Sequence, residues 1–354
     1  MDRPGPALGT AERARLWQVP DLFPIMLSPE TDELVLVAIT EQAYRDASFL
    51  DDREIPTDAS RVLPLEEALR LLDRQTSPAK PVHGIFHVAF CGSTLISRCL
   101  QELDTAFVLK EPFPMHAMAE RRRKVLPGSP GEAAWRRQFR LLVRLLSRTH
   151  RPQQTAIVKP TDASTNLICE LLEHHPGSRA VFLHVGVEEF MLAMLGDRER
   201  MGFVRSRLAE LGELFPDEPV FRFERWNSLP DAAQVASLWM LHARAYARYA
   251  GPNRSSAYRS LDFERFRRAP IATLAALARF LGLEATPLEI EQAVATCTAV
   301  DSKRPGLRHS SADWLRRRRE TERAFHGDMR AGLDWAQGHF ADFHGLQPPA
   351  NPLE

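Results

Sequence analysis

The chain has 354 residues, 44% of them hydrophobic, which is enough for one large domain or two small ones with a well-filled core. Basic and acidic residues number 46 each, so no net charge draws the chain toward nucleic acid or a membrane surface. No stretch approaches the roughly 18 uninterrupted apolar residues of a membrane span, and the N-terminus lacks the apolar core of a signal peptide. The four cysteines show no metal-ligand spacing and resemble reduced, buried thiols. We expect a cytoplasmic protein that holds no metal.

The N-terminal part, residues 1–80, is expected to be an extension. Its first 30 residues are proline-rich and predict an irregular surface arm. Beyond them, residues 34–40 predict a short strand and residues 65–74 an amphipathic helix.

From residue 81 onward, short apolar runs alternate with amphipathic stretches. Strands are expected at 84–90, 106–114, 155–159, 179–186 and within 255–266. Helices are expected at 95–103, 133–150, 166–175, 187–195, 231–250, 270–283 and 287–297. Unbroken apolar strands between helices are typical of a parallel sheet covered on both faces. We therefore predict a three-layer α/β sandwich over residues 81–340, with a P-loop-like strand, loop and helix, followed by a tail at 341–354.

The strand that ends at residue 90 is followed by the bend CGST and a helix. A helix start offers unpaired N–H groups and partial positive charge, and Ser93 and Thr94 add hydroxyl donors. The sequence thus predicts an anion cradle, although an ordinary N-cap by Ser93 or Thr94 gives the same pattern. A nucleotide-hydrolase loop is disfavoured, because His87 stands where the first glycine belongs and no lysine follows Gly92. No apolar strand ends in an acidic residue that could hold magnesium.

Lysine is the exception among the cations of this chain. Five of the 46 basic residues are lysines, and two of these, Lys110 and Lys159, each end an apolar run before a turn. A compact ammonium suits a side chain that reaches into a site. Since the carboxyl ends of parallel strands meet at one edge, CGST, LKEP and VKPT should lie close together there.

These segments, in order, resemble the superfamily of sulfotransferases that use 3′-phosphoadenosine 5′-phosphosulfate (PAPS). FCGSTLISRCL, LKEP, IVKPTDASTNLICELLEHHPGSRAVFL and YRSLDFERFRRAPIATLAALARFLGL carry the resemblance, which spans roughly residues 84–320. It implies transfer of a sulfuryl group from PAPS to a hydroxyl or amine of a small-molecule acceptor, without a metal. Glu111 would be the base, and Lys159 would contact the sulfuryl group. The expected nucleotide-binding residues are Cys91, Gly92, Ser93, Thr94, Leu95, His184, Lys303, Arg304 and Arg308.

The chain departs from the pattern of this superfamily at three places. Phe90 stands where a lysine or arginine usually precedes the loop, and His184 and Leu192 stand where an arginine and a serine bind the 3′-phosphate. A catalytically degenerate protein that binds a ligand or partner is therefore an alternative, and a P-loop kinase a weaker one.

Overall fold

The computed structural model describes residues 6–250, 256–299, 311–340 and 352–353. Its centre is a five-stranded sheet in which every neighbouring pair is parallel. The predicted α/β architecture with a central parallel sheet is confirmed. The strand order across the sheet is β5 (Ala106–Lys110), β6 (Thr155–Lys159), β4 (Val82–His87), β7 (Ala180–His184) and β8 (Tyr258–Asp262).

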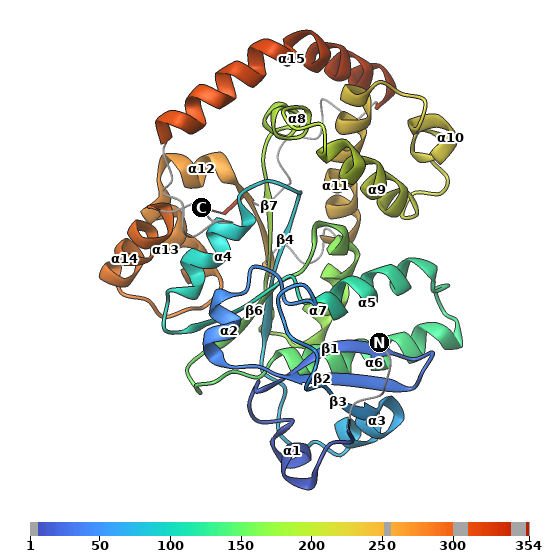
Figure 1. Ribbon diagram of the computed structural model, residues 1–354, viewed down its shortest axis with the longest axis vertical. Helices are drawn as coiled ribbons and strands as arrows, with labels where there is room; N and C mark the ends of the chain where they lie inside the picture. Colours follow the sequence, from blue (N-terminus) through green and yellow to red (C-terminus); the bar gives the residue numbers. More distant parts are fainter. Residues whose placement is uncertain (1–5, 251–255, 300–310, 341–351, 354) are drawn as a thin grey trace.

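Helices cover both faces of this sheet, which explains why its strands are unbroken apolar runs. Strands β4, β5 and β7 are buried at every position. One face carries α4 (Ser93–Gln101) together with α13 (Pro270–Phe280) and α14 (Pro287–Thr298). Figure 1 shows α5 (Phe113–Lys124), α7 (Ile168–His174) and α11 (Asp231–Ala250) on the other side.

The N-terminal part forms a small antiparallel sheet of β1 (Leu22–Ser28), β2 (Glu33–Ala38) and β3 (Arg61–Pro64). The predicted irregular arm over the first 30 residues is wrong, because it contains β1 and α1 (Thr10–Arg15). Strand β1 carries Pro24, and its register shifts between Pro24 and Met26, which breaks the alternation by which a strand is recognised. The helices α2 (Glu41–Asp46) and α3 (Leu65–Asp73) complete this part.

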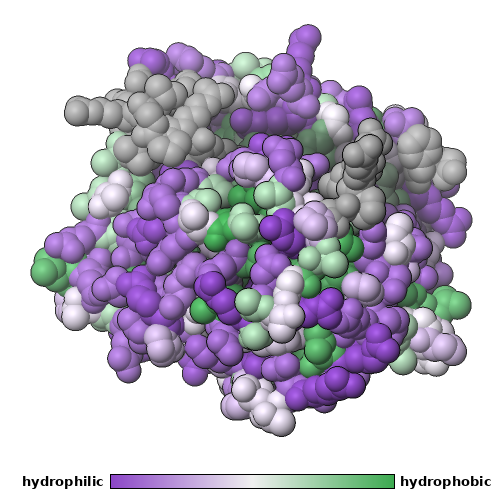
Figure 2. Space-filling model, turned by 60° about the horizontal axis from the view of Figure 1, so that its bottom comes forward, coloured by the Kyte–Doolittle hydropathy of each residue, from purple (hydrophilic) through white to green (hydrophobic). Residues whose placement is uncertain are grey.

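The remaining elements cover the second face and the carboxyl end of the central sheet. They are α6 (Pro130–Leu146), η1 (Asp162–Leu167), α8 (Val187–Leu195), α9 (Arg200–Gly212), η2 (Pro219–Phe221), α10 (Phe223–Trp226), α12 (Phe263–Arg268) and α15 (Ser311–His339). None of the helices within the described ranges is long and apolar enough to cross a membrane. Figure 2 shows a face on which hydrophilic side chains predominate and hydrophobic ones form small separate groups.

Five histidines lie in poorly solvated surroundings that hold them neutral. Burial lowers the pKa of each, to about 3 for His242 and to about 4 for the others, which are His83, His87, His174 and His184. The His242 ring is fully buried, and the nearby Arg207 guanidinium lowers its pKa further.

We predict a loss of stability on mild acidification. The folded-state pKa of each histidine lies below the ordinary value of 6.5, so the unfolded chain takes up protons first as pH falls. The stability that the neutral histidines contribute is therefore fully present above pH 6.5 and is lost as pH falls toward 4. The free energy of unfolding, measured in urea, should therefore fall by about 2 kcal/mol less in a His242→Leu variant than in the wild type between about pH 7 and 5. The same change at the exposed His326 is the control. Identical losses in the wild type and the His242 variant would contradict a buried neutral His242.

Candidate functional site

The order of the strands in the central sheet reverses direction at β4. The two strands that follow β4 in the chain, β5 and β6, lie on one side of it, and the next two, β7 and β8, lie on the other. In open parallel sheets a crevice forms outside the carboxyl ends of the strands at such a point. The loop after β4, the turn after β5 and the turn after β6 all lie at this edge, since Lys110 and Lys159 are register partners and His87 contacts Pro160.

Helix α4 begins at this edge without a side-chain cap. Its N-cap is Gly92, which has no side chain that could accept from the first-turn N–H groups. Ser93 and Thr94 are the first helical residues, so the alternative of an ordinary serine or threonine N-cap is not what the structure shows. The first-turn N–H groups of Ser93, Thr94 and Leu95 thus lack a capping side chain, and the helix dipole adds positive potential. Such a helix start suits a phosphate or sulfate group.

Gly92 is required by both its backbone and its neighbours. Its φ of +81° is left-handed, and a Cβ placed there would lie 2.3 Å from two ring atoms of Phe263. Phe263, the first residue of α12, therefore covers the loop closely. Phe90, two residues earlier, also has a left-handed φ of +56°, which is a strained conformation for a bulky side chain.

Glu111 and Lys159 form an ion pair at the ends of β5 and β6. The Lys159 ammonium is fully buried and contacts Oε1 of Glu111, whose side chain is mostly buried. The Glu111 amide donates to the Lys159 carbonyl at 2.6 Å, and the φ of Glu111 is +47°. A left-handed, non-glycine residue at a turn is uncommon and is often found at functional sites. The pair brings a carboxylate and an ammonium to the same edge as the start of α4.

Lys110 has a different role from Lys159. Its buried ammonium donates to the Arg45 carbonyl and to Oε1 of Gln101, both at 2.7 Å. Burial lowers the pKa of Lys110 to about 7. Lys110 therefore ties α2 and the end of α4 to the sheet and, unlike Lys159, does not pair with Glu111.

Two other predicted binding residues direct their side chains into the protein. The Cys91 thiol is buried and donates to the Leu183 carbonyl at 3.5 Å, and burial raises its pKa to about 12. Only the backbone of Cys91 is placed to meet a ligand. The ring of His184 stacks on Phe182 and is held neutral, so it supplies no charge at ordinary pH. Lys303, Arg304 and Arg308 lie outside the described residues.

His87, which departs from the pattern of a nucleotide-hydrolase loop, also lies between two loops of the site. Its Nδ1 lies 2.9 Å from the Val88 carbonyl, and its Nε2 lies 3.1 Å from the Pro160 carbonyl. Both partners are acceptors, and a neutral ring has one N–H, so only one contact is a hydrogen bond at a time. Its position at the last residue of a buried strand is the signal that could have indicated this role.

Asp162 and Arg207 form a second buried ion pair at this edge. Nε of Arg207 lies 3.1 Å from both carboxylate oxygens of Asp162, which follows β6. Burial raises the pKa of Asp162 and Arg207 opposes this. His242 faces the same carboxylate at 3.6 Å. Nothing local in the sequence links Asp162 to an arginine 45 residues away.

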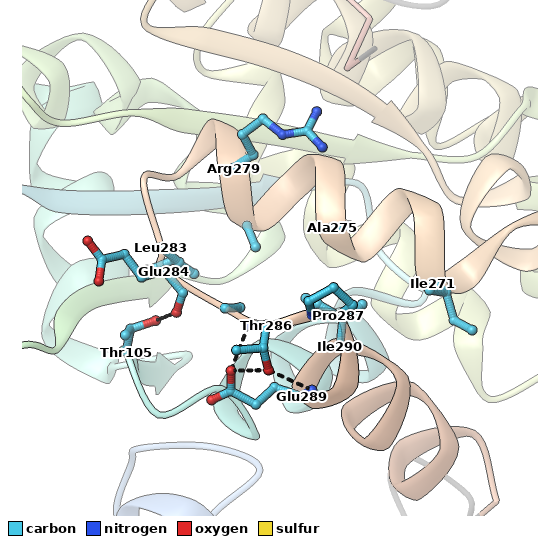
Figure 3. Close-up of a pocket in the computed structure, with 12 residues that line it drawn as sticks. Thr105, Ile271, Ala275, Arg279, Leu283, Glu284, Thr286, Pro287, Glu289 and Ile290 are labelled. Atoms are coloured by element: carbon cyan, nitrogen blue, oxygen red, sulfur yellow. Dashed lines mark hydrogen bonds between the residues drawn. The ribbon is translucent and has the colours of Figure 1, made fainter.

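Two pockets of the structure lie away from these residues. One of about 710 Å³ lies between α13, α14 and Thr105 (Figure 3). Thr105 precedes β5, so this pocket lies at the amino end of that strand, opposite the carboxyl edge of the sheet. Its Glu289 carboxylate is already used to cap Thr286 at 2.7 Å. A second pocket of about 700 Å³ lies between α8, α9, α11 and α15. We place the candidate site at the carboxyl edge because the uncapped helix start and the Glu111–Lys159 pair meet there.

Comparison with known proteins gives matches among solved structures. A scan against protein-family models finds no match, and neither does a search of curated proteins. The chain is similar to the sulfotransferase domain from the curacin biosynthetic pathway at 14% identity, over 61% of this chain and 78% of that one, with a TM-score of 0.39. A sulfotransferase from Mycobacterium tuberculosis matches at 15% identity, over 74% and 81%, with a TM-score of 0.39. Retinol dehydratase in a complex with retinol and PAP matches at 12% identity, over 92% and 96%, with a TM-score of 0.29.

The contact between Gly92 and Phe263 can be tested with a second left-handed glycine as control. Gly128 has a φ of +75° and nothing within 4 Å of an added Cβ. Gly128→Ala should therefore destabilise the protein only by the left-handed backbone term, about 1–2 kcal/mol. Gly92→Ala should cost a further ~1–3 kcal/mol, because the Phe263 ring has to move. Urea unfolding measures both, and equal effects would contradict the close cover of the loop by Phe263.

Proposed function

We propose that this protein transfers a sulfuryl group from PAPS to a hydroxyl or amine of a small-molecule acceptor. The observation that carries the proposal is the Glu111–Lys159 pair at the same sheet edge as the uncapped start of α4. A carboxylate can take a proton, an ammonium can stabilise transferring negative charge, and helix N–H groups can hold a phosphate. These are the functions that such a transfer needs from a protein.

The donor groups at this edge fit the phosphosulfate part of PAPS. Backbone N–H groups of Ser93, Thr94 and Leu95 would hold the 5′-phosphate, and Gly92 allows its close approach. PAPS, when bound, supplies the sulfuryl group together with a phosphate leaving group. Lys159 would stabilise the negative charge that develops on the transferring group and on the leaving oxygen.

Glu111 would act as the base that removes the acceptor proton. The Lys159 ammonium beside it favours the ionised carboxylate, which is the form that accepts a proton. Its left-handed backbone and the bond from its amide to the Lys159 carbonyl hold it in place. The pair keeps both charges neutralised when no ligand is present, and an arriving anion gives Lys159 a second partner. The carboxylate is then less strongly held and can turn to the acceptor.

The nucleotide part of the proposal is tested by calorimetric titration with PAP, the desulfated product, against ADP. PAP carries a 3′-phosphate and ADP does not. We expect PAP to bind at least about tenfold more tightly, since one charge-assisted hydrogen bond contributes that much. Equal binding of the two nucleotides, or no binding of either, would refute PAPS as the co-substrate.

The catalytic part is tested with Glu111→Gln and radiolabelled PAPS, using a panel of phenols and amines as acceptors. Removing a general base should lower turnover by about 10²–10⁴-fold while PAP affinity is kept. The exposed Glu120, which also pairs with a lysine, provides the control Glu120→Gln. A Glu111→Gln enzyme with full turnover contradicts the base assignment. Tight PAP binding without turnover in the wild type would instead support the alternative of a binding protein.

A further inference from the structure

One face of helix α9 packs against the candidate site. Arg200, Phe203 and Arg207 are spaced so that they share a face of this helix. The Phe203 ring meets Phe90 edge-on at 5.7 Å, and Arg207 bonds Asp162. This face, which we call the α9 ridge, therefore contacts the loop after β4 and the turn after β6. Those are the two segments that carry the anion-binding helix start and Lys159.

The two arginines of the α9 ridge are held in different ways. Arg207 is mostly buried, and both Asp162 and Glu210 accept from it, so its charge is already neutralised. Arg200 is 33% exposed, and its carboxylate partner is Asp197, at 3.3 Å from Nε and itself well exposed. Such a surface pair contributes little and is easily exchanged for another anion.

The guanidinium of Arg200 is fixed over the loop by the ring of Phe90. Its central carbon lies 4.5 Å from the ring centroid, and it donates to the Ala193 carbonyl of α8. An aromatic face holds a guanidinium without using its N–H donors. The strained left-handed φ of Phe90 is what presents this ring at the loop. Among the described residues, Nη2 of Arg200 makes no hydrogen bond.

We propose that Arg200 supplies the cation of the anion site at the start of α4, where the loop itself offers an aromatic ring at Phe90. The inference rests on the proposed function, and it assigns to Arg200 a phosphate or sulfate oxygen of the bound nucleotide. A planar guanidinium with free donors suits such an oxygen. The side chain is already ordered by Phe90, Asp197 and Ala193, so little freedom is lost on binding.

The experiment compares Arg200→Gln with a matched arginine of the same helix. Arg205 is 48% exposed and pairs with Asp231 at 2.9 Å, away from the α9 ridge. Calorimetry with PAP, and thermal shift with inorganic pyrophosphate, are measured for the wild type, Arg200→Gln, Arg200→Lys and Arg205→Gln. Melting temperatures without ligand confirm that each variant is folded. A Phe90→Lys change in the Arg200→Gln background then places a cation directly in the loop.

We expect Arg200→Gln to weaken PAP binding at least about tenfold, the effect of one charge-assisted hydrogen bond. Arg205→Gln should leave it unchanged, Arg200→Lys should fall in between, and the added Phe90→Lys should restore part of the affinity. Wild-type affinity in Arg200→Gln would overturn the assignment, as would an equal loss in Arg205→Gln.

The pyrophosphate titration separates this inference from the proposed function. If pyrophosphate binds through Arg200 but PAP is not preferred to ADP, the anion site stands and the sulfotransferase proposal falls. If PAP binds selectively and Arg200→Gln has no effect, the proposed function stands and the role of Arg200 is refuted. Absence of binding to either ligand refutes both.

Discussion

An ammonium group that is fully buried at the end of β6 has to be neutralised from within the protein, and this need shapes the whole carboxyl edge of the sheet. An unpaired buried charge costs several kcal/mol, so Lys159 requires the Glu111 carboxylate beside it. Glu111 reaches that place because β5 and β6 pair with Lys110 opposite Lys159, and because the backbone turns left-handed one residue later. A shift of one residue in this register would direct Lys159 to the other face of the sheet. The ion pair therefore depends on both the strand register and the strained backbone of Glu111, and none of the three can change alone.

The same constraint couples the ion pair to the loop before α4. His87 ends β4 and its ring lies against the carbonyls of Val88 and Pro160, so the loop before α4 and the turn after Lys159 lie side by side. Since the lowered pKa of His87 keeps its ring neutral, this connection adds no second cation beside Lys159. Phe263 closes the other side of the loop at Gly92. The helix start thus has a fixed position relative to the pair, which a transfer between two bound groups requires.

The sheet and its edge could be predicted from the sequence because both are local features. Buried parallel strands are unbroken apolar runs, and the turns CGST, LKEP and VKPT mark where the strands end. Strand β1 was missed because Pro24 and a bulge break its pattern. The different roles of Lys110 and Lys159 were not predictable, since they depend on Gln101 and Arg45 at one and on Glu111 at the other. The periodicity of apolar residues predicts on which face of an element a side chain lies, but not which distant side chain it contacts.

The α9 ridge places a cation over a loop whose own side chain at that point is an aromatic ring. The charge of a lysine within the loop would keep its position relative to the loop if the loop moved. Here the ring of Phe90 provides a surface, and the cation that lies on it comes from α9, 110 residues further along the chain. The same ridge bonds Asp162 beside the turn of Lys159, so any movement of α9 changes the surroundings of both the loop before α4 and the ion pair. The position of the Arg200 guanidinium over the loop therefore depends on the packing of α9 against α8 and α11.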